Sequence, residues 1–98
     1  MFGLPEKTVH EIRDCLAQYP SIQWVKIYGS RAKGNYAHGS DIDLAFSGAT
    51  DLSAALLSAL DALPTPYLFD VTHYDTLQHA ALKAHIDRVG ILLYERKS

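Results

Sequence analysis

The sequence is poor in cysteine, has no long apolar run and shows no excess of basic charge. Its single cysteine, Cys15, excludes an internal disulfide framework and any zinc site built on cysteine pairs. No apolar run approaches the ~18 residues that a membrane span requires. Nine basic side chains stand against eleven acidic ones, and the formal charge is −2. Such a balance gives no electrostatic footprint for direct binding to duplex nucleic acid.

The chain also lacks a recognisable targeting segment. Its first residues contain neither a basic stretch nor an apolar core of the kind found in signal peptides, so we expect a cytoplasmic protein. The 98 residues, 48% of them hydrophobic and 20% charged, are ordinary for a globular chain. We therefore expect a single domain over residues 1–98.

Apolar periodicity, interrupted by proline and glycine, predicts four helices and four strands. Helices are expected over 6–19, 30–36 (broken at Gly34), 51–63 and 75–88, and strands over 22–28, 42–46, 67–73 and 91–94. The helix over 75–88 would place Leu77, Ala81, Ala84 and Arg88 on one side, with Ile86 and Val89 beside them. The order αβαβαβαβ indicates an α+β or mixed α/β fold, with a mixed sheet of about four strands and helices mainly on one face.

Three aspartates stand out in the second and third predicted strands. Asp41 and Asp43 are two residues apart at the head of the second strand, so they should point to the same face. If the third strand pairs with the second, Asp70 lies about 5 Å across from them. Three carboxylates so close together repel one another unless a cation neutralises them or one takes up a proton. Oxygen ligands suit Mg²⁺ or Mn²⁺, and two such ions ~3.5–4 Å apart can clamp a phosphoryl or nucleotidyl group during transfer.

A Gly-Ser turn ten residues earlier fits the same chemistry. Gly29 has no Cβ and lets the backbone approach a phosphate, and Ser30 can cap a short helix whose free N–H groups attract anions. Arg31 and Lys33 could bind further phosphate oxygens, and Gly34 permits the left-handed residue that ends such a helix.

Each of these features has a structural explanation when taken alone. An isolated D-x-D is usually a solvated strand edge, and an isolated Gly-Ser is usually a turn. Asp70, in an otherwise apolar strand, would be costly to bury unpaired, although a salt bridge with Arg31 could also account for it. The joint pattern of Gly-Ser, D-x-D and a third aspartate is what indicates a nucleotide site.

These residues resemble the signature of a known family. The segment that carries them runs from Gly29-Ser30-Arg31-Ala32-Lys33-Gly34 through Ser40-Asp41-Ile42-Asp43-Leu44. It resembles the motif of DNA polymerase β-like nucleotidyltransferases. Within that group it is most similar to the minimal nucleotidyltransferases (MNT, MntA-like antitoxins). The resemblance implies the polymerase β-like fold and transfer of a nucleoside monophosphate, AMP from ATP, to an acceptor hydroxyl with Mg²⁺.

The resemblance also implies roles and partners. Asp41 and Asp43 would bind both metal ions, and Asp70 would complete the catalytic ion's ligands and help to activate the acceptor. Gly29 and Ser30 would hold the triphosphate, assisted by Arg31 and Lys33. Relatives of this kind are encoded beside a HEPN-domain protein, form a hetero-oligomer with it, and silence that toxin by adding AMP to a tyrosine. A chain this short has little room for an acceptor domain, which favours a protein acceptor.

Two other functions stay open at this point. The chain could be a non-catalytic antitoxin that neutralises its partner by occlusion, or a small-molecule nucleotidyltransferase of the aminoglycoside type.

Histidine and aromatic residues give weaker signals. His73 could line the rim of the site, whereas His79 and His85 fall on different faces of one helix. Tyr28 and Trp24 are expected to pack in the core, although Tyr28 or Tyr36 could stack on a base. His38 is expected to be exposed, and Cys15 to be buried in the first helix.

Overall fold

A computed structural model describes residues 1–34 and 40–97 of the chain. The elements, in chain order, are α1 (Glu6–Ala17), β1 (Ile22–Tyr28), α2 (Ser30–Lys33), β2 (Ile42–Gly48), α3 (Ser53–Asp61), β3 (Phe69–His73), the 3₁₀ helix η1 (Tyr74–Thr76), α4 (Ala80–Val89) and β4 (Ile91–Glu95). The predicted order of helices and strands is confirmed. None of the helices in the described ranges is long and apolar enough to cross a membrane.

The strands form one mixed sheet in the order β3-β2-β1-β4. β1 runs antiparallel to both β2 and β4, whereas β2 and β3 are parallel because α3 carries the chain back between them. The mixed sheet of four strands is therefore as predicted.

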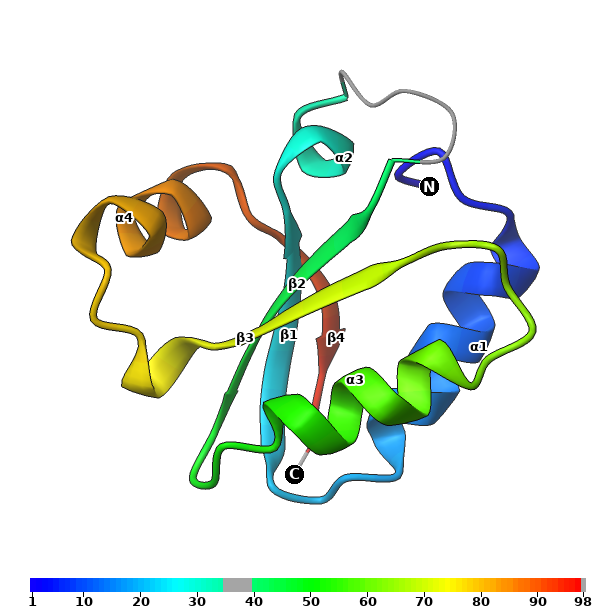
Figure 1. The fold of residues 1–98 in the computed structure, drawn as a ribbon, viewed down its shortest axis with the longest axis horizontal. Helices are drawn as coiled ribbons and strands as arrows, with labels where there is room; N and C mark the ends of the chain where they lie inside the picture. The colour runs from blue at the N-terminus through cyan, green and yellow to red at the C-terminus, as the bar shows by residue number, and fades with distance from the viewer. Residues whose placement is uncertain (35–39, 98) are drawn as a thin grey trace.

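The main core lies on one face of the sheet. Figure 1 shows α1 and α3 together on one side of the sheet, with α4 well away from them. Apolar residues at helical spacing in α1 pack with alternate residues of β1 and β2 and with two leucines of α3; these include Val9, Ile12, Cys15, Leu16, Val25, Ile27, Leu44, Phe46, Leu56 and Leu60. Cys15 is buried there, as expected, and burial raises the pKa of its thiol.

The opposite face carries a smaller cluster beneath α4. Tyr28 of β1, Ala45 of β2 and Ile86 of α4 are buried together. Side chains alternate along a strand, so Asp43, two residues before Ala45, belongs to this same face. The face covered by α4 is therefore the one on which the candidate site lies, and we call it the site face.

The last helix is shorter than predicted. The helix expected over 75–88 divides into η1, an extended stretch and α4. The backbone is extended at Leu77 and at His79 (ψ 121° and 98°), which interrupts the helix. His79 precedes the first turn of α4, and its Nδ1 accepts a hydrogen bond from the N–H of Leu82 at 3.1 Å. The predicted buried side is also wrong: Ile86 is buried, whereas Ala81, Ala84 and Arg88 are exposed.

The remaining boundaries shift by a few residues. α1 ends at Ala17 rather than at residue 19, and β3 begins at Phe69 rather than at residue 67. α3 begins at Ser53, because the Asp51 carboxylate accepts hydrogen bonds from the backbone N–H and the hydroxyl of Ser53 (3.0 and 2.6 Å). β2 continues through Gly48, two residues beyond the predicted end.

Candidate active site

Asp43 and Asp70 lie directly opposite each other in the sheet. The parallel register pairs Ile42 with Phe69 and Asp43 with Asp70, so both carboxylates project from adjacent strands on one face. The condition on which the expected closeness of Asp70 rested, that these two strands pair, is met. Asp41 is the residue immediately before β2 and is exposed.

Asp70 is not buried, contrary to the expectation from its apolar strand. Asp43 is half-buried, whereas Asp70 is exposed, so the argument from a costly buried carboxylate at Asp70 is wrong. β3 is an edge strand, paired with β2 alone, and Asp70 projects from it on the site face. The significance of Asp70 comes from its position opposite Asp43.

The electrostatics of the pair favour a cation. Burial, together with the negative charges of Asp70 and Asp41, raises the pKa of Asp43, and the opposing influence of His85 is the smallest of the four. The shift has the direction expected of carboxylates that repel one another. A bound cation would relieve this repulsion.

The possible metal ligands at this site are the carboxylates of Asp43, Asp70 and Asp41. Within residues 1–34 and 40–97, no three His, Cys, Asp or Glu side chains are oriented so that they could hold a metal ion together. The chemistry nevertheless fits a hard divalent cation: all donors are carboxylate oxygens, and Asp43 and Asp70 are already brought together by the backbone.

The turn after β1 brings the backbone against Asp43. Gly29 has φ 73° and ψ −152°, a combination open essentially to glycine alone. A Cβ added to Gly29 would lie 2.4 Å from Oδ2 of Asp43, well inside contact distance. The glycine is therefore required twice, for its backbone conformation and for the close approach of the carboxylate.

Helix α2 follows this turn and spans four residues. Gly29 occupies the position before the helix, where no side chain caps the first turn, and Ser30 is the first helical residue. The expectation that Ser30 caps the helix is therefore wrong. Gly34 ends the helix in the left-handed conformation (φ 83°), as predicted, and Lys33 is exposed in the last turn.

Arg31 points into the protein. Its side chain is 3% exposed, and its guanidinium donates hydrogen bonds to the carbonyl oxygen of Ser40 (3.0 and 2.8 Å) and to that of Phe2 (3.0 Å). The guanidinium also lies 5.1 Å from the ring centre of Tyr67. These contacts tie the residue before Asp41 to the start of the chain. A direct contact between Arg31 and phosphate stays a prediction.

Tyr28 and His85, which the sequence did not assign to the acidic pair, lie beside it. The hydroxyl of Tyr28 lies 3.3 Å from Oγ1 of Thr72 in β3, and His85 of α4 meets the Tyr28 ring edge-on, with centroids 6.1 Å apart. Burial raises the pKa of Tyr28; the hydrogen bond with Thr72 opposes this, and the charges of Asp70 and Asp43 add to the increase. The sequence did not place His85 at the site, because its position there depends on how α4 packs over Tyr28.

Tyr28 is 6% exposed, which agrees with the expected role in packing. Trp24 is half-buried, and its ring packs against that of Tyr74 in η1, with centroids 5.1 Å apart. Tyr36 and His38 lie outside the described residues.

His73 belongs to the core rather than to the rim of the site. It is 6% exposed and stacks on Phe46, on the face covered by α1 and α3. Its ring nitrogens bond to the carbonyl of Gly48 at 2.8 Å and to the hydroxyl of Thr76 at 2.9 Å. A position lining the site is therefore excluded for this residue.

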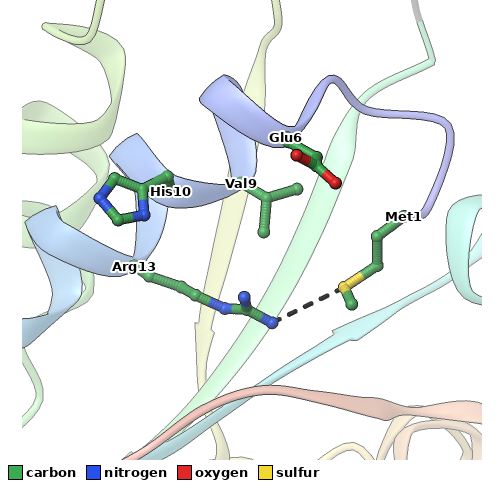
Figure 2. Close-up of a pocket in the computed structure, with 5 residues that line it drawn as sticks. All are labelled: Met1, Glu6, Val9, His10 and Arg13. Atoms are coloured by element: carbon green, nitrogen blue, oxygen red, sulfur yellow. Dashed lines mark hydrogen bonds between the residues drawn. The ribbon is translucent and has the colours of Figure 1, made fainter.

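Two surface hollows lie apart from the aspartates. The hollow in Figure 2, of about 290 Å³, is lined by Met1, Glu6, Val9, His10 and Arg13, and an Arg13 nitrogen lies 3.6 Å from the Met1 sulfur. A second hollow, of about 430 Å³, lies between α1 and α3. Both involve α1, whose core face is opposite the site face, so the acidic pair belongs to neither.

Comparison with known proteins identifies the family and the fold of this chain. The family described as polymerase beta, nucleotidyltransferase, matches residues 10–98. A search of curated proteins found no match. Since the family match covers most of the sequence, the chain belongs to the polymerase beta nucleotidyltransferase family.

Solved structures show the same fold. A crystal structure of a toxin–antitoxin with AMP-PNP matches with a TM-score of 0.68 and 23% identity, over 91% of this chain and 74% of that chain. The toxin–antitoxin MntA–HepT matches with a TM-score of 0.63 and 21% identity, over 94% and 74% of the two chains. The tri-AMPylated Shewanella oneidensis HEPN toxin in complex with the MNT antitoxin matches with a TM-score of 0.63 and 21% identity, over 93% and 72%. The chain thus has the architecture seen in minimal nucleotidyltransferase antitoxin complexes.

Proposed function

We propose that this chain is a metal-dependent nucleotidyltransferase that moves AMP from ATP to an acceptor hydroxyl and releases pyrophosphate. The observation that carries the proposal is the acidic pair: Asp43 lies opposite Asp70, with the backbone of Gly29 packed against its carboxylate. Paired carboxylates beside a close backbone turn are suited to hold the cations and phosphates of a nucleoside triphosphate.

The proposed roles are those that the family resemblance implies, and the positions of the residues support them. Asp41 and Asp43 would hold two Mg²⁺ ions, with Mn²⁺ as the alternative, and Asp70 would complete the ligands of one. When bound, such ions neutralise the charge that develops on the transferred phosphoryl group. Gly29 and Ser30 would position the triphosphate through backbone N–H groups, and exposed Lys33 would add a positive charge. Arg31 would act on phosphate indirectly, by fixing the segment before Asp41.

The acceptor is proposed to be a protein. The chain shares its fold with a chain in the complex of a tri-AMPylated HEPN toxin and the MNT antitoxin. By analogy, we propose that it acts as the antitoxin of a HEPN-domain protein encoded by a neighbouring gene, forms a hetero-oligomer with it, and adds AMP to one of its tyrosines. A cytoplasmic location stays a prediction.

Intact mass spectrometry tests this function. The chain is co-purified with the product of the neighbouring gene, supplied with ATP and Mg²⁺, and both proteins are weighed. We expect the neighbour to gain one or more AMP units with the native chain and with Asp75→Asn, an exposed control in η1. The Asp41→Asn/Asp43→Asn variant should transfer nothing.

Transfer by the double variant would refute the assigned mechanism. A tight complex with no change in mass, for the native chain and the variant alike, would instead favour neutralisation by occlusion.

A further inference from the structure

Tyr28 crosses the central strand of the site. It stands opposite Asp43 on β1, yet its hydroxyl reaches Thr72 on β3, with β2 between the two strands. The path runs over Ala45, the partner of Thr72 in the parallel register. Ala45 is fully buried and belongs to one cluster with Tyr28, so its small side chain leaves room for the ring to lie across β2.

This contact opposes a force that acts on β3. As an edge strand, β3 is paired with the sheet on the β2 side alone. The same pairing sets Asp70 directly opposite Asp43, and like charges in that position push neighbouring strands apart. A hydrogen bond from β1 to Thr72, two residues beyond Asp70, ties the edge strand back to the sheet close to the point of repulsion.

We propose that Tyr28 and Thr72 form a positioning pair that holds Asp70 opposite Asp43 for divalent-cation binding. Neither hydroxyl needs to touch the cation. Groups that orient metal ligands typically change metal affinity by 10- to 100-fold when they are removed. The inference rests on the proposed function, because it assumes that the acidic pair binds a metal ion.

The test measures Mn²⁺ binding by electron paramagnetic resonance, with no nucleotide and no turnover. Tyr28→Phe and Thr72→Val each remove one hydroxyl and keep the shape of the side chain. We expect each variant to bind Mn²⁺ about 10-fold more weakly than the native chain. Thr72→Ser keeps the hydroxyl and should bind like the native chain.

The double variant separates positioning from stability. Each single variant leaves one part-buried hydroxyl without this partner, whereas Tyr28→Phe/Thr72→Val removes both hydroxyls. Thermal unfolding of the double variant should therefore return towards the native midpoint while Mn²⁺ binding stays weak. A purely structural bond would make affinity and midpoint recover together.

A matched control exists elsewhere on the chain. The hydroxyl of Tyr74 in η1 donates a 2.6 Å hydrogen bond to Asp87 of α4, so Tyr74→Phe removes a comparable bond that does not involve β3. This variant should bind Mn²⁺ with native affinity.

The outcomes distinguish this inference from the proposed function. Native binding that is lost in Asp43→Asn, with Tyr28→Phe and Thr72→Val both within twofold of native, would overturn the inference and leave the proposed function standing. Absence of Mn²⁺ binding by the native chain, or unchanged binding by Asp43→Asn, would overturn both.

Discussion

Replacing Asp43 by asparagine should stabilise the metal-free chain. Burial and the charges of Asp70 and Asp41 raise the pKa of Asp43, which means that folding disfavours its ionised form. The stability supplied by the protonated carboxyl is fully present below the unfolded pKa of about 3.9 and is lost as the pH rises through the raised folded pKa. Asparagine carries no charge, so Asp43→Asn escapes this loss at neutral pH.

The size of the gain follows from the sheet geometry. Adjacent strands lie about 4.8 Å apart, and two unit charges at that spacing repel by roughly 1 kcal/mol in water and roughly 3 kcal/mol at an effective dielectric of 20. Asp70 is exposed, which favours the lower value. For a domain of this size, about 1 kcal/mol raises the unfolding midpoint by about 4–8 °C.

Thermal unfolding in a chelator measures the effect. At pH 7 the midpoint of Asp43→Asn should exceed that of the native chain by this amount, and the difference should vanish near pH 3, where the native carboxyl is neutral in both states. Mg²⁺ should raise the native midpoint and leave that of the variant unchanged. A metal-free variant no more stable than the native chain at pH 7, or a gain that persists at pH 3, would refute the electrostatic reasoning.

Three further substitutions test the structural parts of the site. Gly29→Ala should lower stability by about 1–3 kcal/mol and abolish transfer, because it forces a Cβ against the Asp43 carboxylate at a strained φ; chemical denaturation and the mass assay check both effects. His73→Leu should cost about 1–3 kcal/mol in denaturation because it leaves the buried Gly48 carbonyl without its partner, while transfer below the unfolding transition stays native. Arg31→Lys should unfold at lower denaturant concentration, by about 2–3 kcal/mol, since an ammonium group cannot reproduce the guanidinium's bonds to separate carbonyls; native stability would contradict its assigned role.

Local sequence signals predicted the part of the fold that carries the acidic pair. The strands that carry Asp43 and Asp70 were both predicted from local signals, and their observed pairing is the one on which the expected closeness of the two aspartates depended. Gly34 was also predictable, because a left-handed helix end is a local requirement that glycine meets best.

The contacts of Arg31 depend on tertiary structure and were not predictable in the same way, whereas the position of His73 could have been derived from the strand pattern. Arg31 stands in a phosphate-binding motif by sequence. Its hydrogen bonds to the carbonyl oxygens of Ser40 and Phe2 join residues that are distant in sequence, so only the folded structure reveals them. His73 is close to Asp70 in sequence but faces the other side of the sheet, as an odd number of residues along a strand requires. The alternation rule alone could have excluded this histidine from the site.

The arrangement of the sheet explains how one small fold carries both stability and a repulsive site. The α1/α3 face supplies most of the close-packed apolar core, whereas the site face keeps a small cluster beneath α4. Like charges, a strained glycine and a hydroxyl bridge all lie on or beside the site face, where β1 ends and β2 begins. Since the like charges of Asp43 and Asp70 cost stability unless a cation offsets them, metal binding should stabilise this edge of the sheet more than the α1/α3 face. Hydrogen exchange with and without Mn²⁺ should therefore show protection concentrated in β2 and β3 around Asp43 and Asp70, and uniform protection across α1 and α3 would contradict this division.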